Sequence, residues 1–192
     1  MYKRVTLRDT VEVPPEHLAD VTPELVKKLL QDKLEGRVDE EVGSVVSVIE
    51  VGEIGEGAVL PNEPGVYYDA TFDALTFDPQ MQEVVDGEVV EVVNFGAFVG
   101  IGPVDGLLHV SQISDEYLAY DGENQALASR ESNETLGVGD SVRARIVTKS
   151  IDERNPRDSK IGLTAKQVGL GKHGWLKAER EQREAAAEPG EN

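Results

Sequence analysis

The stretch GEVVEVVNFGAFVGIGPVDGLLHVSQI, residues 87–113, decides the fold of the second half of this chain of 192 residues. Short runs of valine and other apolar residues alternate here with single glycines. Such runs are typical of consecutive antiparallel strands in a small sheet or barrel. Phe95, Phe98 and His109 lie among these small residues. The pattern predicts an aromatic surface of the kind on which the bases of single-stranded nucleic acid stack.

The spacing of the two phenylalanines leaves two structures open. Phe95 and Phe98 are three residues apart, whereas side chains on one face of a regular strand are two apart. Either one ring belongs to the core, or a bulge at Gly96 turns both rings outward. His109 lies beside apolar residues, so it suits a position in the barrel wall as well as a contact with a ligand.

The rest of this half completes a barrel. Residues 141–147 (SVRARIV) alternate as a strand that places Arg143 and Arg145 on the face opposite the valines. Residues 160–164 predict a last short strand. The segment 114–137 is rich in Asp, Glu, Asn and Ser, and we expect a long loop with a helical turn at its start. Five short strands with glycine corners and one long connection fit an OB-type barrel.

The first half predicts a helix packed on a sheet. Residues 2–13 and 66–77 alternate as strands, and residues 42–51 are rich in valine. Thr22, followed by Pro23, predicts the N-terminal cap of a helix that ends at Gly36. The glycines and prolines of residues 52–65 predict a turn-rich connection. The three lysines of the helix are expected on its solvated face; they are Lys27, Lys28 and Lys33.

The predicted fold class is therefore an α+β N-terminal domain followed by an all-β OB-fold barrel and a short C-terminal helix. We place the N-terminal domain at residues 1–80 and the barrel at 81–168. Residues 169–192 form a C-terminal extension, with a helix from 173 to about 187 and a disordered end.

The composition limits the chemistry. The chain has no cysteine and three histidines far apart in the sequence, so we expect no metal site and no cofactor. Its acidic pairs show no arrangement that favours catalysis over chance. No run of eighteen apolar residues exists, and the N-terminus lacks an apolar signal core. We therefore expect a cytoplasmic, non-catalytic protein without a membrane span.

The charge distribution is uneven. The net charge is −18, and Arg130 is the single basic residue between Val38 and Asp140. Eleven of the 19 basic residues follow Ser141. The acidity predicts a protein adapted to molar salt, where the Debye length falls to ~3 Å and repulsion of RNA is screened. The alternative is an acidic protein of an ordinary cell.

Several motifs agree in order and spacing with a known domain. They are Phe95-Gly96-Ala97-Phe98-Val99, Gly106-Leu107-Leu108-His109-Val110-Ser111 and Lys160-Ile161-Gly162-Leu163-Thr164. These motifs resemble the OB-fold RNA-binding domain named after ribosomal protein S-one. The resemblance continues through residues 72–79, 102–106 and 169–172 and Trp175. Together they resemble the E-prime family of archaeal DNA-directed RNA polymerase subunits, which is similar to the seventh subunit of eukaryotic polymerase II.

The resemblance implies that the two domains have different functions. In that family, an N-terminal domain of truncated ribonucleoprotein-like fold docks the stalk on the RNA polymerase core. The S-one type domain faces the emerging single-stranded RNA transcript. The smaller stalk subunit, known as F, is the heterodimer partner, and the pair assists promoter opening and elongation without catalysis. The alternative function is that of a translation factor or ribosome-associated RNA-binding protein that uses the same barrel.

The resemblance also implies site residues. In such domains the aromatics that match Phe95 and Phe98 both lie on the RNA face, and His109 matches an RNA contact. The acidic residues around this surface lead us to expect weak, sequence-tolerant binding.

Further candidates lie later in the barrel. Lys160 matches a basic position that opens the last strand, and Asp152 matches a polar position before it. Arg143 and Arg145 are additional candidates, for which a solvated strand face is an equal explanation.

Overall fold

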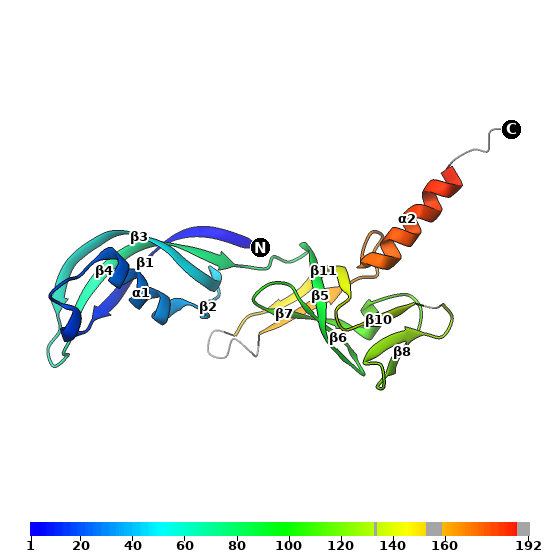
Figure 1. Cartoon of the computed structure of the whole chain (residues 1–192), viewed down its shortest axis with the longest axis horizontal. Coiled ribbons are helices and arrows are strands. Elements are labelled where there is room, and N and C mark those ends of the chain that lie inside the picture. The colour runs from blue at the N-terminus through cyan, green and yellow to red at the C-terminus, as the bar shows by residue number, and fades with distance from the viewer. Residues whose placement is uncertain (133, 153–158, 188–192) are drawn as a thin grey trace. The chain divides into compact units, whose positions relative to one another are not determined.

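The computed structural model describes residues 1–132, 134–152 and 159–187 (Figure 1). The described chain forms two compact units. The first consists mainly of Met1–Asp78, and the second consists of Pro79–Ser150 and the residues from Ser159 onward.

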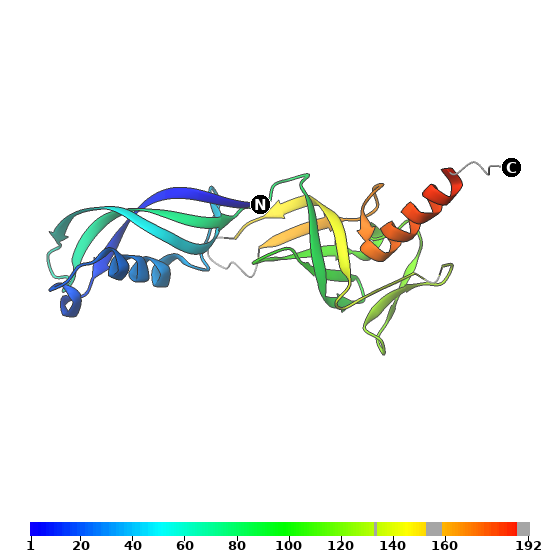
Figure 2. The ribbon, with the colours of Figure 1, turned by 45° about the horizontal axis from the view of Figure 1, so that its top comes forward.

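The first unit is one antiparallel sheet covered by a helix. Its elements are β1 (Tyr2–Val13), a 3-10 turn η1 (Pro15–His17), α1 (Pro23–Leu34), β2 (Val38–Asp39), β3 (Gly43–Val59) and β4 (Val66–Phe77). The strand order is β1-β4-β3-β2. Figure 2 shows α1 lying against one face of this sheet. The helix buries Val26 and Leu30 against the apolar side of the strands, where Phe72 is buried.

The ends of α1 follow from its sequence. The Thr22 hydroxyl accepts a hydrogen bond from the backbone N–H of Leu25 at 3.3 Å, as an N-cap does. Past the helix, Gly36 adopts φ of 79°, a left-handed conformation that glycine tolerates and that ends helices. The predicted helix is confirmed.

One prediction for this unit was wrong, and a second needs an addition. The glycine-rich segment after residue 51 is not a turn-rich connection, because β3 continues to Val59 alongside β4. Four register shifts along this pair absorb the irregular spacing. Lys33 is not simply solvated: its Nζ lies 2.7 Å from Asp9 and donates to the carbonyl of Thr10. Because Lys33 pairs with Asp9, this charged residue can interrupt the apolar face of β1.

The second unit is a closed barrel with additions. Its elements are β5 (Val84–Val93), β6 (Gly96–Gly100), β7 (Asp105–His109), η2 (Val110–Gln112), β8 (Leu118–Asp121), β9 (Ala126–Ser129), β10 (Thr135–Gly137), β11 (Ser141–Ser150), β12 (Lys160–Thr164), β13 (Gly171–Lys172) and α2 (His173–Ala187). The order is β12-β7-β6-β5-β11-β13, and a β12–β11 pairing closes the ring. β12 pairs with β7 in parallel and with β11 in antiparallel orientation, so it lies between these two strands in the barrel. The predicted fold class, including the helix at 173–187, is confirmed.

The segment between β7 and β11 corrects another prediction. Residues 114–137 are not one long loop, because they form a small antiparallel sheet in the order β10-β9-β8. Leu118, Leu127 and Leu136 are buried in it, one from each strand. Polar residues dominate the segment, and these three leucines provide the apolar contacts that hold the strands together.

Candidate nucleic-acid interface

Phe95 and Phe98 form a pair on the outer wall of the barrel. Their ring centroids are 6.4 Å apart and the ring planes make an angle of 84°, an edge-to-face contact. Phe95 is 45% exposed and Phe98 is half-buried. Because the planes are nearly perpendicular, one base cannot lie flat on both rings. The pair offers two faces of different orientation for stacking.

The structure resolves the spacing problem in a third way. Phe95 lies in the turn that precedes β6, so strand alternation does not apply to it. Gly96 is not a bulge, since it pairs in register with Val93 on one side and His109 on the other. The irregularity lies across from it in β5, between Val89 and Glu91. Gly96 is needed because a Cβ there would overlap the carbonyl oxygen of Leu108.

His109 lies at the end of β7 beside this pair and has a structural contact of its own. Its Nδ1 accepts a hydrogen bond from the backbone N–H of Ser111 at 3.2 Å and lies 2.8 Å from the Ser111 hydroxyl. The lone pair on Nδ1 is therefore used to cap the short helix η2. The ring is exposed, and its Nε2 edge is left for another partner.

A row of outward-facing residues connects the aromatic pair with β12. Phe98 pairs with Leu107 of β7, and Leu107 pairs with Gly162 of β12. Lys160 lies two residues before Gly162 and is exposed, so the strand alternation places it on the same outer face. Strand spacing puts its backbone on the order of 12 Å from that of Phe98. Phe95, Phe98 and His109 are thus brought together, with Lys160 at the margin; we call the first three the aromatic platform.

Arg143 and Arg145 point outward from β11, as predicted, yet they lie two strands away from β7. Arg143 donates to both carboxylate oxygens of Asp86, at 2.8 and 3.2 Å. The Nε2 of His173 lies 3.0 Å from the same carboxylate. These bonds, above all that from Arg143, hold the pKa of Asp86 below its ordinary value. Arg145 contacts the carbonyl of Gln82.

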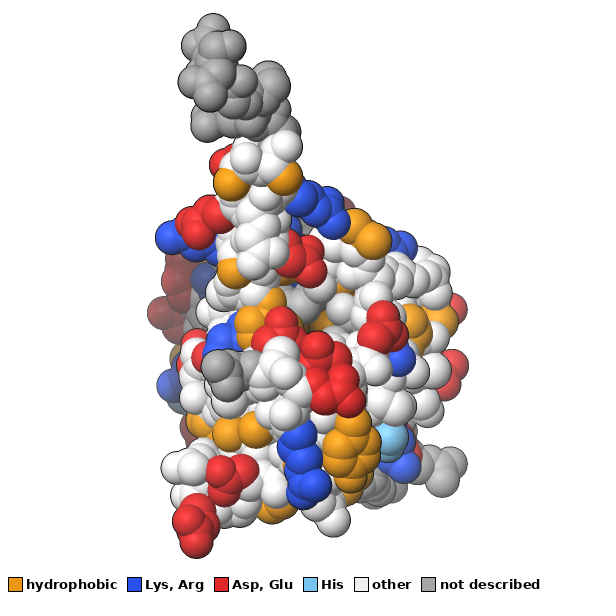
Figure 3. All heavy atoms as spheres, turned by 90° about the vertical axis from the view of Figure 1, so that its right-hand side faces the viewer, with side chains coloured by type: hydrophobic (Ala, Val, Ile, Leu, Met, Phe, Trp, Pro, Cys, Tyr) orange, Lys and Arg blue, Asp and Glu red, His pale blue; other side chains and the backbone are white. Residues whose placement is uncertain are grey.

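Acidic side chains border the aromatic platform. Glu91 pairs directly with Phe98 across the strands, and Asp105 pairs with Gly100 at the other end of β6. Both are exposed. Figure 3 shows a face of the molecule on which acidic and basic side chains are interspersed around hydrophobic ones. Such a surface favours contacts with bases over a strong electrostatic hold on phosphates.

Asp152 lies just after β11 and is half-buried. Most of the connection from there to β12, residues 153–158, lies outside the described residues. The described chain does not bring Asp152 into the aromatic platform.

Sequence reasoning missed two groups of exposed side chains. Tyr117 and Tyr120 are 73% and 42% exposed beside and on β8, in the segment taken for a loop. Arg180 and Arg183 of α2 line a pocket against β11. Their spacing of three residues on a predicted helix was a signal that could have found the arginines.

The described residues carry no group of three or more His, Cys, Asp or Glu that could hold a metal ion. None of the helices in the described ranges is long and apolar enough to cross a membrane.

Comparison with known proteins accounts for both units. Residues 78–160 match the S1 RNA binding domain, and residues 8–65 match the SHS2 domain found in the N terminus of Rpb7p and Rpc25p. The chain is 35% identical to the DNA-directed RNA polymerase subunit Rpo7 of Sulfolobus acidocaldarius over 180 residues, 93% of this chain and 97% of that protein. The same subunit of Saccharolobus solfataricus is 35% identical over 178 residues, 92% of this chain and 97% of the relative.

The barrel alone also has relatives of another kind. The polyribonucleotide nucleotidyltransferase of Afipia carboxidovorans is 33% identical over 95 residues, which are 49% of this chain and 13% of that enzyme. Because the match covers so little of the enzyme, its activity does not transfer. The matches to Rpo7 span both units, and this chain therefore belongs to the Rpo7 family of archaeal DNA-directed RNA polymerase subunits, as a non-catalytic subunit whose second unit is an S1 domain.

Proposed function

We propose that this chain is the larger stalk subunit of its polymerase, pairs with the smaller stalk subunit and holds the emerging single-stranded transcript on the aromatic platform. By doing so, the pair assists promoter opening and elongation in the cytoplasm. The observation that carries the RNA contact is the edge-to-face pair of the exposed Phe95 and the half-buried Phe98 beside His109, in a domain of the S1 family.

The packing of the barrel core does not require these rings to be exposed. The core is already filled by apolar residues that point inward, among them Val89, Leu108 and Leu163. Burying a phenylalanine stabilises a fold, so a ring left in water on a strand wall needs another explanation. Each base stacked on such a ring contributes ~1–3 kcal/mol to binding, and every base has a face that can stack. The bordering acids limit affinity, so we propose weak, sequence-tolerant binding, with Lys160 at the margin of the platform.

The remaining candidates belong to the proposal in different ways. Lys160 begins β12 at the edge of the proposed RNA path, whereas Asp152 is a candidate from the sequence resemblance alone. Arg143 is already bonded to Asp86, and Arg145 is half-buried beside Gln82. We therefore expect both arginines to contribute less to RNA binding than the aromatic platform does.

The decisive test is crosslinking of RNA in polymerase reconstituted with the full chain. Alanine at Phe95, Phe98 and His109 should weaken the crosslink of the transcript to this chain and leave assembly with the smaller stalk subunit intact. Tyr2→Ala, which removes an exposed aromatic side chain from the first unit, is the matched control and should have no effect. An unchanged crosslink in the triple variant would contradict the proposed platform.

For the first unit, residues 1–80 in the sequence-based division, we propose docking on the polymerase core. The unit carries an open pocket of about 460 Å³ beside α1 and β2. Leu7, Leu34 and Phe72 contribute apolar walls, and Arg37 and Glu41 contribute charge. An apolar pocket with a charged rim is a suitable receptor for a side chain of a partner subunit.

The docking proposal is tested by purification. Val42→Glu would place a charge in this pocket and should reduce recovery of core subunits with the tagged chain, whereas Lys28→Glu on the exposed side of α1 should not. Recovery of ribosomal or initiation components instead of polymerase would overturn the stalk assignment in favour of a translational role.

A further inference from the structure

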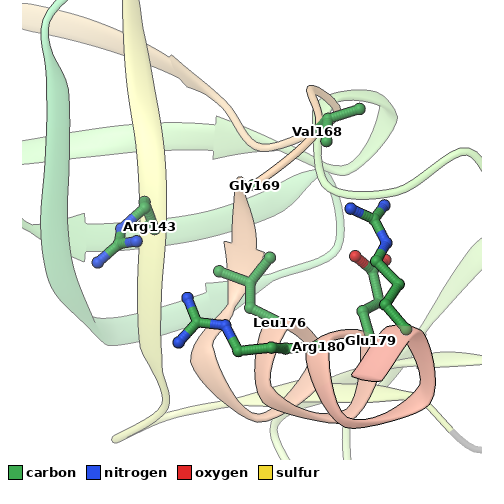
Figure 4. Close-up of a pocket in the computed structure, with 7 residues that line it drawn as sticks. Arg143, Val168, Gly169, Leu176, Glu179 and Arg180 are labelled. Carbon is green, nitrogen blue, oxygen red and sulfur yellow. The ribbon is translucent and has the colours of Figure 1, made fainter. Parts of the chain in front are cut away.

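A groove lies between α2 and the barrel, away from the aromatic platform. It consists of two adjoining pockets of about 180 and 170 Å³. They share Arg143, Leu176 and Arg180, and we call the combined feature the α2 groove. Its remaining lining residues are Val168, Gly169, His173, Lys177, Glu179 and Arg183. Figure 4 shows Arg143 on β11 opposite Leu176 and Arg180 on α2.

The helix presents one face to this groove. Leu176, Arg180 and Arg183 follow the spacing of four and three residues that aligns side chains along a helix. Leu176 is half-buried, whereas both arginines are exposed. The floor is thus apolar and the rim carries guanidinium groups.

The two helix arginines differ in their ion pairing from about half of the described lysines and arginines of this acidic protein. Within the described ranges, neither Arg180 nor Arg183 has a carboxylate at ion-pair distance, although Glu179 lies next to Arg180 in sequence. Desolvation raises the pKa of Glu134, and repulsion from Glu116 and then from Glu179 raises it further, so Glu179 adds a negative charge to this region. About half of the other described lysines and arginines have a carboxylate within 4 Å; they are Lys3, Arg4, Arg8, Lys33, Arg143, Lys166, Lys172 and Lys177.

The other wall of the groove is fixed in place. Asp86 holds Arg143 of β11 and His173 at the start of α2 together, so it ties the helix to the barrel. The arginine side chains of α2 therefore project from a helix whose beginning is anchored. A guanidinium presents its donors in a planar fork that matches two oxygens of a phosphate.

We propose that the α2 groove binds phosphodiester groups of single-stranded RNA, with Arg180 and Arg183 donating to phosphate oxygens. This inference rests on the proposed function, because it takes RNA to reach the barrel. It adds a second site of different chemistry: the aromatic platform holds bases, and the α2 groove holds the backbone. The wall that carries Arg143 lies within the segment that matches the S1 RNA binding domain, which favours RNA over an acidic peptide as the occupant.

The barrel supplies a path between the two sites. Arg145 pairs with Thr164 of β12, and β12 pairs with β7, the strand that ends at His109. Arg143 lies two residues before Arg145 on the same face of β11. Strand geometry makes this path on the order of 15 Å, so a strand of a few nucleotides can reach both sites.

Salt dependence separates the two sites. We would measure the affinity of the full chain for a long oligouridylate over a series of salt concentrations. Arg180→Gln with Arg183→Gln should make the slope of log affinity against log salt shallower by about 1.4, since each phosphate contact to a single strand contributes about 0.7. Phe95→Ala with Phe98→Ala should lower the affinity at every salt concentration and leave the slope unchanged.

Matched variants control for total charge and for folding. Lys27→Gln with Lys28→Gln removes two charges from α1 and should leave the slope unchanged. Arg180→Lys with Arg183→Lys should retain most of the slope, because the charge remains. An abasic oligoribonucleotide should still bind the wild-type chain and should lose this binding in the Arg180/Arg183 glutamine variant.

The outcomes separate this inference from the proposed function. A slope unchanged by the glutamine variant overturns the α2 groove as an RNA site, even where the platform variant weakens binding. A reduced slope together with an inert platform variant supports the groove and overturns the platform. Loss of a co-purifying polymerase component with intact RNA binding overturns the inference and assigns the groove to a protein contact.

Discussion

The outer faces of the two units differ in how many of their polar and charged groups are bonded to one another. On the first unit, each carboxylate of β4 that faces outward is bonded by an arginine and a threonine of β1. Asp73 accepts hydrogen bonds from Arg4 at 2.7 Å and Thr6 at 2.6 Å. Asp69 accepts in the same way from Arg8 at 2.8 Å and Thr10 at 2.6 Å. We call these two carboxylates and their four donors the polar ladder.

The second unit leaves several exposed groups without such partners, although Arg143 is bonded to Asp86. Phe95 is exposed to water, the Nε2 edge of His109 has no hydrogen bond among the described residues, and Arg180 has no carboxylate beside it in the described chain. The difference shows which face is suited to bind a ligand. A polar ladder whose members are already bonded gains little from a new partner, whereas exposed rings and unpaired guanidiniums gain both stacking and hydrogen bonds.

Salt should have the largest effect, because it acts on both units. The polar ladder neutralises only a few of the 37 acidic residues, and the remaining carboxylates repel one another. We expect the melting temperature to rise steeply with potassium chloride and the fold to be lost below roughly molar salt. A thermal scan followed by circular dichroism measures this. Greater stability in dilute buffer would remove the proposal of a halophilic protein.

Gly96→Ala should destroy the platform and spare the polar ladder. The added Cβ would overlap the carbonyl oxygen of Leu108 and lie 2.9 Å from the Cα of His109, so β6 and β7 must separate. We expect a loss of about 2–4 kcal/mol in the unfolding free energy of the second unit. Urea denaturation of the full chain measures the loss. Gly174→Ala in α2 is the control and should be neutral or slightly stabilising; an equal loss in both would refute the explanation.

Breaking the polar ladder should change acid stability and leave RNA binding alone. Hydrogen bonds from Thr6, and then from Arg4, hold the pKa of Asp73 below its ordinary 3.8. A lowered pKa in the folded state contributes stability that is complete above this value and is lost as the pH falls through and below it. Asp73→Asn should therefore flatten the decline of stability in that window.

Urea midpoints over a pH series measure this effect, with Asp32→Asn on the exposed side of α1 as the control. A change of RNA affinity in Asp73→Asn would show that the polar ladder does take part in binding.

The smallest effect should come from Glu134, whose charged carboxylate lowers the stability of the folded state. Desolvation, followed by repulsion from Glu116 and Glu179, raises the pKa of Glu134 above its ordinary 4.5. A raised pKa of an acid means that stability falls as the pH rises through that value. Glu134→Gln should thus slightly stabilise the protein at neutral pH, and the gain should vanish below pH 4.5. Glu131→Gln, at an exposed position nearby, should show no such difference in melting temperature.

The elements that could be predicted are those with strong local signals. Thr22 and Gly36 mark the ends of α1, and the alternation of residues 141–147 marks β11, because capping and strand alternation depend on neighbours in sequence. The order and spacing of the motifs from Gly87 to Thr164 were sufficient to predict a closed barrel. The prediction failed for β3 after residue 51 and for β8–β10, where glycines or polar residues hide strands that only pairing with a partner makes stable.

The features of the candidate site likewise divide into those that the sequence determined and those that only the tertiary structure decided. The sequence by itself determined that Phe95, Phe98 and His109 stand close to one another among glycines, and that basic residues gather in the last third of the chain. Tertiary structure decided that Phe95 leaves the strand in a turn, that Asp86 occupies Arg143, and that Arg180 and Arg183 lie against β11 with no carboxylate at ion-pair distance in the described chain. Local signals specify backbone conformation, whereas the pairing of charges depends on which distant strands the closed barrel brings together.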